Sequence, residues 1–174
     1  MLILILMCST LVFGLKIWNL SELVKLGDVS VALLFKIEKV AEFIKVPAEF
    51  DVIIYESENL AEFHQLSNRP YHVAAVYKNG MIITQPFYIL KQKGLLEEVL
   101  FHEILHSILK KNFQLPAWIE EGFILFITGA DFDELRGFHR DYFLRFIRRV
   151  RYEEIPDLLD CYRIDSSMEC DNGR

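Results

Sequence analysis

Residues 95–111 read LLEEVLFHEILHSILKK, and their apolar side chains recur with the period of an α-helix. His102 and His106 lie four residues apart, so such a helix places both imidazoles on one face, one turn apart. Glu103 lies about 100° further round the helix. Because apolar residues surround these three on nearly all sides, we expect a buried helix in which the polar groups need a partner. The motif, HExxH, predicts a metal ion bound by the two histidines; the alternative is a pair of hydrogen-bonded core residues.

A third ligand is expected a short distance along the chain, in residues 115–123, which read LPAWIEEGF. Catalytic zinc sites keep three protein ligands and leave one position open for water. A carboxylate on a helix close to the histidines can complete such a set. Glu120 and Glu121 are both candidates, and their spacing does not choose between them.

HExxH followed by Pro-x-Trp-x-x-Glu-Gly resembles the gluzincin-type zinc metallopeptidases, the peptidase MA-like family. The specific part of the resemblance spans residues 101–123. It implies that His102, His106 and Glu121 bind Zn²⁺ and that Glu103 is the general base. Glu120 is then a neighbour of the ligands or exposed to solvent. The resemblance implies a zinc-dependent peptidase, an endopeptidase that hydrolyses peptide or protein substrates through a metal-activated water.

The rest of the chain predicts an α+β domain, with all of the expected strands before Gly94 and only helices from Gly94 onward. We expect helices at 29–45, 58–66, 95–111, 117–128 and 133–151, and strands at 50–55, 71–77 and 81–85. Asn79-Gly80 predicts a tight hairpin between the last two strands. The resemblance implies a zincin-like fold: a small mixed sheet with an edge strand over the HExxH helix, and a helical C-terminal half. Met81–Gln85 is the expected edge strand, to which an extended substrate adds.

Two functional roles are not assigned by the motif itself. Thermolysin-like members carry an acidic residue where this chain has Leu125, so a backbone carbonyl or Asp131 is expected to orient a histidine instead. The oxyanion of the reaction needs a hydrogen-bond donor. Tyr142, His139 and Tyr152 are candidates, with Tyr142 preferred, and the alternative for each is an ordinary packing or surface residue.

The N-terminus predicts export. Residues 1–14 are apolar up to Phe13 and have the length of a signal peptide, too short for a membrane span. An uncleaved anchor and a buried helix are the alternatives, so the protein is expected to be periplasmic, secreted or N-terminally anchored. We expect the chain after this segment to form a single domain over residues 15–155 and a polar tail over residues 156–174. Cys161 and Cys170 are a candidate disulfide, as an oxidising compartment permits; the alternative is two unrelated thiols.

The charge of the chain limits its partners. A net charge of −6 argues against nucleic acid or anionic lipid as the main partner, so membrane contact is expected only through an uncleaved N-terminal segment. The arginines between Arg136 and Arg151 predict a solvated helix face, with a basic docking surface as the alternative. Two rival functions stay open: a catalytically inactive zincin-fold binding protein, and a zinc amidase acting on a non-protein amide. The oligomeric state is not predicted.

Overall fold

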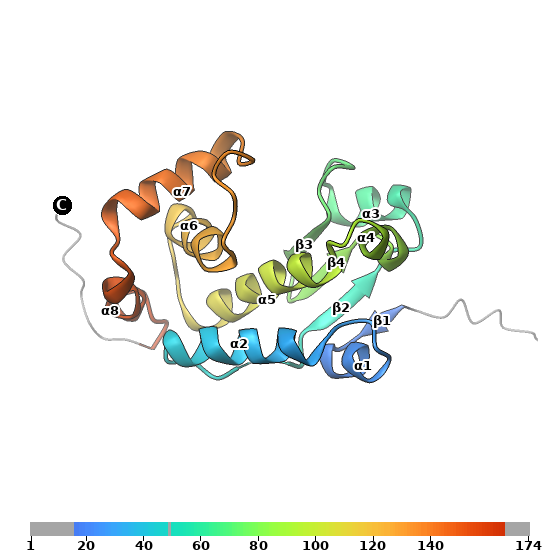
Figure 1. Cartoon of the computed structure of the whole chain (residues 1–174), viewed down its shortest axis with the longest axis horizontal. Coiled ribbons are helices and arrows are strands. Elements are labelled where there is room, and N and C mark those ends of the chain that lie inside the picture. The colour runs from blue at the N-terminus through green and yellow to red at the C-terminus, as the bar shows by residue number, and fades with distance from the viewer. Residues whose placement is uncertain (1–15, 49, 166–174) are drawn as a thin grey trace, which may run out of the picture.

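The computed structural model describes residues 16–48 and 50–165, which form an α+β domain with a small four-stranded mixed sheet (Figure 1). The strands are β1 (Ile17–Trp18), β2 (Ile53–Glu56), β3 (Ala75–Lys78) and β4 (Met81–Thr84). The longer helices are α2 (Val31–Phe43), α3 (Leu60–Ser67), α5 (Leu96–Asn112), α6 (Ala117–Thr128) and α7 (Gly137–Arg149). The shorter ones are α1 (Leu20–Lys25), α4 (Phe87–Gln92), α8 (Ile155–Asp160) and the 3₁₀ turn η1 (Tyr152–Glu154). The predicted signal peptide, residues 1–14, lies outside the described residues.

The sheet has the order β1-β2-β4-β3, which corrects the predicted edge strand. Met81–Thr84 pairs in parallel with β2 on one side and antiparallel with β3 on the other, so β4 is an inner strand. Its Ile82, Ile83 and Thr84 are buried accordingly. The edge strand beside α5 is β3, the first strand of the hairpin. The sequence showed that these two strands pair, but not which side of the pair β2 occupies.

The hairpin turn between β3 and β4 is the one that its sequence predicts. Asn79 and Gly80 both have positive φ, at 52° and 82°. Such a turn matches the right-handed twist of the two strands that it connects. It fixes the register in which Tyr77 lies opposite Ile82.

Helix α5 runs through the middle of the molecule, with α2 along one side and α6 along the other (Figure 1). Its Leu100, Ile104, Leu105 and Ile108 are completely buried, and it also contacts β3 and β4. The predicted burial of this helix is therefore confirmed. Polar groups that project from it into the protein need partners there.

Helix α6 is bounded by the residues that the sequence predicts. Pro116 precedes its first residue, and Gly129 ends it with a left-handed backbone at φ 71°. Gly122 allows α6 to approach α7 closely, since a Cβ there would lie 2.5 Å from Phe146 Cβ and 3.0 Å from the carbonyl oxygen of Tyr142. The close contact sets the position of the neighbouring residue, Glu121.

The folded body continues past residue 155, where the sequence placed the start of a polar tail. Ile155 and Leu159 of α8 are buried in the core. The residues after α8 then pair with the loop between α5 and α6: Gln114 N donates to Tyr162 O at 2.8 Å, and Ile164 N to Asn112 O at 3.0 Å. Cys161 is disulfide-bonded, and its predicted partner, Cys170, lies outside the described residues.

Over residues 16–48 and 50–165, no helix has the length and apolar character required to span a bilayer.

Candidate metal centre

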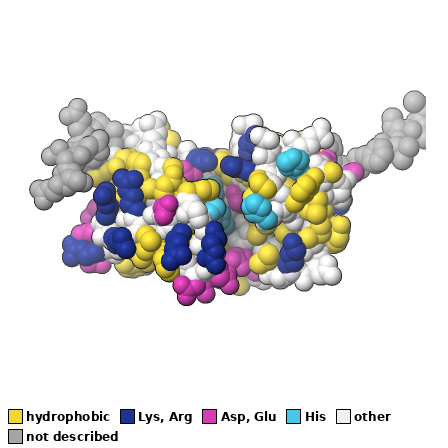
Figure 2. All heavy atoms as spheres, turned by 90° about the horizontal axis from the view of Figure 1, so that it is seen from above, with side chains coloured by type: hydrophobic (Ala, Val, Ile, Leu, Met, Phe, Trp, Pro, Cys, Tyr) yellow, Lys and Arg dark blue, Asp and Glu magenta, His cyan; other side chains and the backbone are white. Residues whose placement is uncertain are grey.

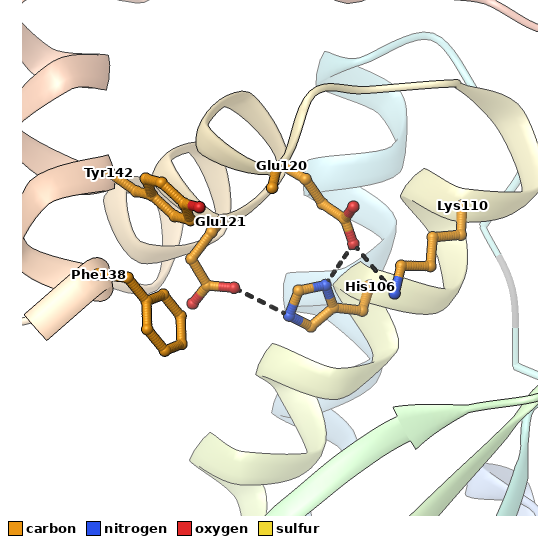
Figure 3. A pocket seen from close by; sticks show the side chains of 7 residues that line it. His106, Lys110, Glu120, Glu121, Phe138 and Tyr142 are labelled. Atoms are coloured by element: carbon orange, nitrogen blue, oxygen red, sulfur yellow. Dashed lines mark hydrogen bonds and ion pairs between the residues drawn. The ribbon is translucent and has the colours of Figure 1, made fainter.

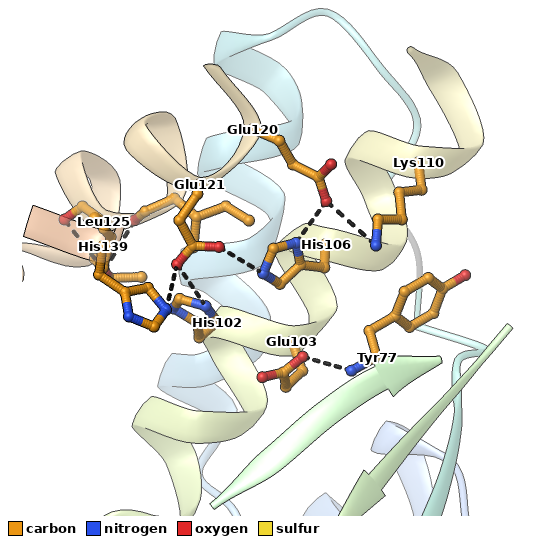
Figure 4. A network of polar contacts seen from close by, with 11 residues as sticks. Tyr77, His102, Glu103, His106, Lys110, Glu120, Glu121, Leu125 and His139 are labelled. Carbon is orange, nitrogen blue, oxygen red and sulfur yellow. Dashed lines mark hydrogen bonds and ion pairs between the residues drawn. The ribbon is translucent and has the colours of Figure 1, made fainter. Parts of the chain in front are cut away.

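Three side chains from α5 and α6 converge on one point (Figure 4). His102 Nε2 lies 3.6 Å from Glu121 Oε1, and His106 Nε2 lies 3.3 Å from Glu121 Oε2. One ligand atom from each of the three residues lies within 4.8 Å of the others. These residues form a group that could hold a metal ion. The helical spacing of the two histidines and the close approach of α6 at Gly122 together produce it.

The chemistry of this group fits a zinc ion. Two imidazoles and a carboxylate are ligands that zinc commonly takes, with bonds of about 2.0–2.2 Å. Neighbouring ligand atoms of a tetrahedral site with such bonds are about 3.3–3.5 Å apart. The two histidine-to-carboxylate separations, 3.6 and 3.3 Å, are near this range, and one atom from each of the three residues lies within 4.8 Å of the others. Moreover, the buried Oε1 atom of Glu121 makes no hydrogen bond within the described part of the chain. A buried carboxylate oxygen is costly without a partner, and a cation between the three side chains would provide one.

Glu103 lies beside these ligands and points elsewhere. Its carboxylate accepts a hydrogen bond from Tyr77 N of the edge strand β3, at 2.6 Å (Figure 4). Burial raises the pKa of Glu103, while the charge of His106 and this hydrogen bond act against that rise. The side chain is thus held between the candidate metal ligands and the edge strand.

Glu120 and Glu121 have different partners, which resolves the choice that the sequence left open. Glu121 faces the Nε2 atoms of both histidines, whereas Glu120 Oε1 lies 2.6 Å from His106 Nδ1. A carboxylate at Nδ1 holds the ring in the tautomer that leaves Nε2 free for a metal. The expectation that Asp131 does this is wrong, because Asp131 is exposed and accepts a hydrogen bond from Asp133 N in its own turn.

Lys110 is a residue of the site that the sequence reading missed. Its ammonium group lies 3.5 Å from Glu120 Oε1 and 5.6 Å from the centre of the Tyr77 ring. It therefore connects the carboxylate behind His106 to the edge strand. The signal was present, since Lys110 follows His106 by four residues and so shares its helix face.

The two histidines differ in their affinity for protons. Burial, together with the nearby charge of His106, lowers the pKa of His102 to about 4. Burial acts the same way on His106, but its hydrogen bonds to Glu120 and Glu121 outweigh it and raise the pKa to about 9. Without a metal, His106 is therefore protonated at neutral pH and His102 is not.

A pocket of about 360 Å³ opens beside the ligands. Its walls come from α5, α6 and α7: His106, Lys110, Ala117, Glu120, Glu121, Phe138 and Tyr142 (Figure 3). On the surface, a hollow with histidine side chains in it separates the two halves of the molecule (Figure 2). The carboxylates and histidines thus border a space that solvent can enter.

The three candidate oxyanion donors occupy different places. Tyr142 lines the pocket, on the side of Glu121 that faces α7 (Figure 3). His139 is also close, with Nε2 3.4 Å from Glu121 Oε1. Tyr152 is not a pocket-lining residue; its ring stacks on Phe43 with a centroid distance of 4.8 Å. Of the three, Tyr142 and His139 lie beside the candidate metal centre.

Comparisons of the chain with protein-family models, with curated proteins and with solved structures found no match. Inferences about function therefore rest on the residues of the site and on the sequence motif.

Proposed function

We propose that this protein is a zinc-dependent peptidase, with His102, His106 and Glu121 as the ligands of the ion. The observation that carries the proposal is the convergence of these three side chains beside a fourth, Glu103, that is not among them. Three ligands are the number found at catalytic zinc sites, whereas structural sites have four. The open pocket next to the group agrees with a role in catalysis.

The chain's own residues then perform the proton transfers of a peptide hydrolysis. A bound zinc ion supplies Lewis acidity, which lowers the pKa of water to about 7 and polarises the scissile carbonyl. Glu103 accepts a proton from the attacking water as its oxygen bonds to the carbonyl carbon. When the C–N bond breaks, Glu103 delivers this proton to the leaving amine. The oxyanion needs a donor; Tyr142, which lines the pocket, is the preferred candidate, and His139, 3.4 Å from Glu121, is the second.

The surroundings of the site support a zincin-like fold. The HExxH helix packs against a mixed sheet, and the strand beside it, β3, is an edge strand with main-chain groups that β4 does not use. An extended peptide can add to such an edge through main-chain hydrogen bonds. Glu103 is hydrogen-bonded to this same strand, so a peptide bound there lies next to the base. Because residues 1–14 resemble a signal peptide, we place the activity outside the cytoplasm, with an endopeptidase as the expected type.

Metal analysis and one substitution test the proposal. We expect the purified full chain to hold about one equivalent of zinc and to cleave peptides from a mixed library. Glu103→Gln retains the ligands and is expected to bind zinc as before, while turnover falls by at least about a hundredfold, as for the loss of a general base. Binding of less than half an equivalent of zinc, or full activity in Glu103→Gln, would refute the proposal.

A further inference from the structure

Two arginines of α7 lie against one tryptophan of α6 and have no acidic partner among the residues that the structure describes. The guanidinium carbons of Arg145 and Arg149 are 4.3 and 5.9 Å from the centre of the Trp118 ring. Over residues 16–48 and 50–165, neither side chain forms an ion pair or a hydrogen bond. Stacking uses the flat face of a guanidinium and leaves the N–H groups at its edge available. Both arginines are thus held in place with unused donors.

These arginines continue the face of α7 that borders the pocket. Phe138 and Tyr142, which line the pocket, lie at positions i and i+4, and Arg145 and Arg149 follow at i+7 and i+11. Such spacing places all four on one stripe of the helix. Along the helix axis, Arg145 and Arg149 are about 4.5 and 10.5 Å from Tyr142, at 1.5 Å per residue. An extended peptide covers this interval in about two to four residues, at about 3.3 Å each.

The charge of this region contrasts with that of the protein. Residues 136–151 contain six arginines and one aspartate, although the chain as a whole carries −6. Figure 2 shows basic side chains gathered on the half of the molecule that carries α7. Other arginines of the segment have partners: Arg136 donates to backbone carbonyls and Arg151 pairs with Glu153 and Glu154. The pair on Trp118 is therefore a local excess of positive charge on the same stripe of α7 as the pocket residues Phe138 and Tyr142.

We propose that Arg145 and Arg149 form an anion-binding subsite that selects peptide substrates with an acidic side chain a few residues from the cleaved bond. The inference rests on the proposed peptidase function and names the substrate class. Carboxylate and phosphate groups both match the planar fork of a guanidinium. An anion between the two arginines also reduces the repulsion between their charges. Trp118 and the pocket residues supply the contact surface for the uncharged part of the chain.

Peptide binding by the zinc-loaded Glu103→Gln protein tests this subsite without turnover. Three fluorescein-labelled peptide pools differ only in containing Glu, phosphoserine or Gln at fixed positions, and binding is followed by fluorescence anisotropy. We expect the two anionic pools to bind at least about tenfold more tightly than the Gln pool, as for charge-assisted hydrogen bonds. The comparison of Glu with phosphoserine shows which anion the pair prefers. The preference should weaken as ionic strength rises.

Substitutions in the same Glu103→Gln background assign the effect to the arginines. Adding Arg145→Gln and Arg149→Gln should remove the preference for the anionic pools. Arg148→Gln also removes positive charge from α7, but Arg148 lies off the stripe. This control should therefore retain the preference. Equal binding of all three pools, or a preference that survives the loss of both arginines, overturns the subsite.

The same measurements separate this inference from the function on which it rests. If the wild type holds zinc and cleaves peptides but ignores their charge, the subsite fails and the peptidase stands. If the wild type binds no zinc or cleaves nothing, the same binding measurements are made on the protein without added zinc. A preference that depends on the two arginines then means that the peptidase fails and the anion-binding site stands.

Discussion

Glu120 and Glu121 are adjacent in the sequence, yet one faces the metal-binding nitrogens and the other faces the back of a histidine ring. The difference arises because consecutive residues of α6 point about 100° apart, so that only one of them reaches both Nε2 atoms. Glu120 then holds His106 by its Nδ1 atom, with Lys110 behind it.

Removing the carboxylate of Glu120 should weaken zinc binding. Glu120→Ala frees the His106 ring to rotate and to change tautomer, and losses of this kind lower metal affinity by about 10–100-fold. Competition with a chelator of known affinity measures the effect. Glu134→Ala, an exposed glutamate in the turn before α7, is the matched control and should leave the affinity unchanged. An unchanged affinity in Glu120→Ala would show that the ring is held by packing alone.

Zinc uptake should release a proton from His106. In the metal-free protein the pKa of His106 is raised to about 9, so its proton is present at pH 7.5 and must leave when a metal binds. Affinity is therefore expected to rise with pH up to about 9, by up to one log unit per pH unit. His102, with its pKa lowered to about 4, adds no proton above about pH 5.

Calorimetry in buffers with different ionisation enthalpies counts the protons released at pH 7.5. We expect a value close to one, falling toward zero above pH 9. A value of zero at pH 7.5 contradicts the assignment of the proton to His106.

At this scale the sequence alone placed His102, Glu103 and His106, because the spacing of two ligands and a base on one helix is a local property. It could not separate Glu120 from Glu121 without the family resemblance. The resemblance offered Glu120 as a neighbour of the ligands or as an exposed residue, but the sequence did not predict its contact with His106, and it missed Lys110. A contact between two helices depends on how they cross.

At the scale of the elements, the contact between α6 and α7 determines where Glu121 lies. Gly122 has ordinary helical backbone angles, so its role is steric: a methyl group there meets Phe146 and the backbone of Tyr142. The residue before Gly122 is Glu121, which supplies the carboxylate of the candidate metal centre.

Gly122→Ala should therefore affect both stability and metal binding. The added methyl overpacks the interface, which costs about 1–3 kcal/mol of unfolding free energy. Pushing α6 away from α7 should also lower zinc affinity. Chemical denaturation of the zinc-free protein measures the first effect. In a Phe146→Gly background the cost of Gly122→Ala should shrink, because the Cβ and Cγ atoms of residue 146 that would clash with the added methyl are then absent. Equal costs in both backgrounds would place the effect elsewhere.

The elements themselves were predicted unevenly. Helices over 96–112 and 117–128 match their predicted ranges to within one residue, because periodicity, Pro116 and Gly129 define them locally. Three six-residue helices, α1, α4 and α8, were missed. Six residues make fewer than two helical turns, which is too short for the apolar residues to show a helical period. The prediction that β4 is the edge strand was wrong, because its second neighbour, β2, is distant in the sequence and such a non-local pairing leaves no local signal.

On the scale of the whole molecule, the candidate metal centre joins the two central helices of the fold. In the metal-free protein, Glu121, nearly buried at 8% exposure, keeps an unbonded oxygen within the described residues. Occupancy of the site is therefore linked to the global stability of the domain.

Removing zinc should lower the melting temperature. A ligand that binds only the folded state at a hundred times its dissociation constant adds about 2.7 kcal/mol to the free energy of unfolding. Calorimetric or fluorescence melts of the loaded and chelated protein measure the shift. His102→Ala should show no dependence on zinc, whereas Glu103→Gln should shift like the wild type, because Glu103 is not a ligand. Equal melting temperatures with and without zinc would contradict occupancy of this site.

The backbone pairing of residues 112–114 with residues 162–164 has a consequence for how the protein is made. The loop between the two ligand-bearing helices is clamped by a segment translated about fifty residues later. Both histidines and Glu121 are therefore synthesised before the segment that fixes the connection between their helices. The site should reach its final geometry only once that segment can pair, so a chain truncated after Cys161 should hold zinc more weakly than a chain that ends at Asp165.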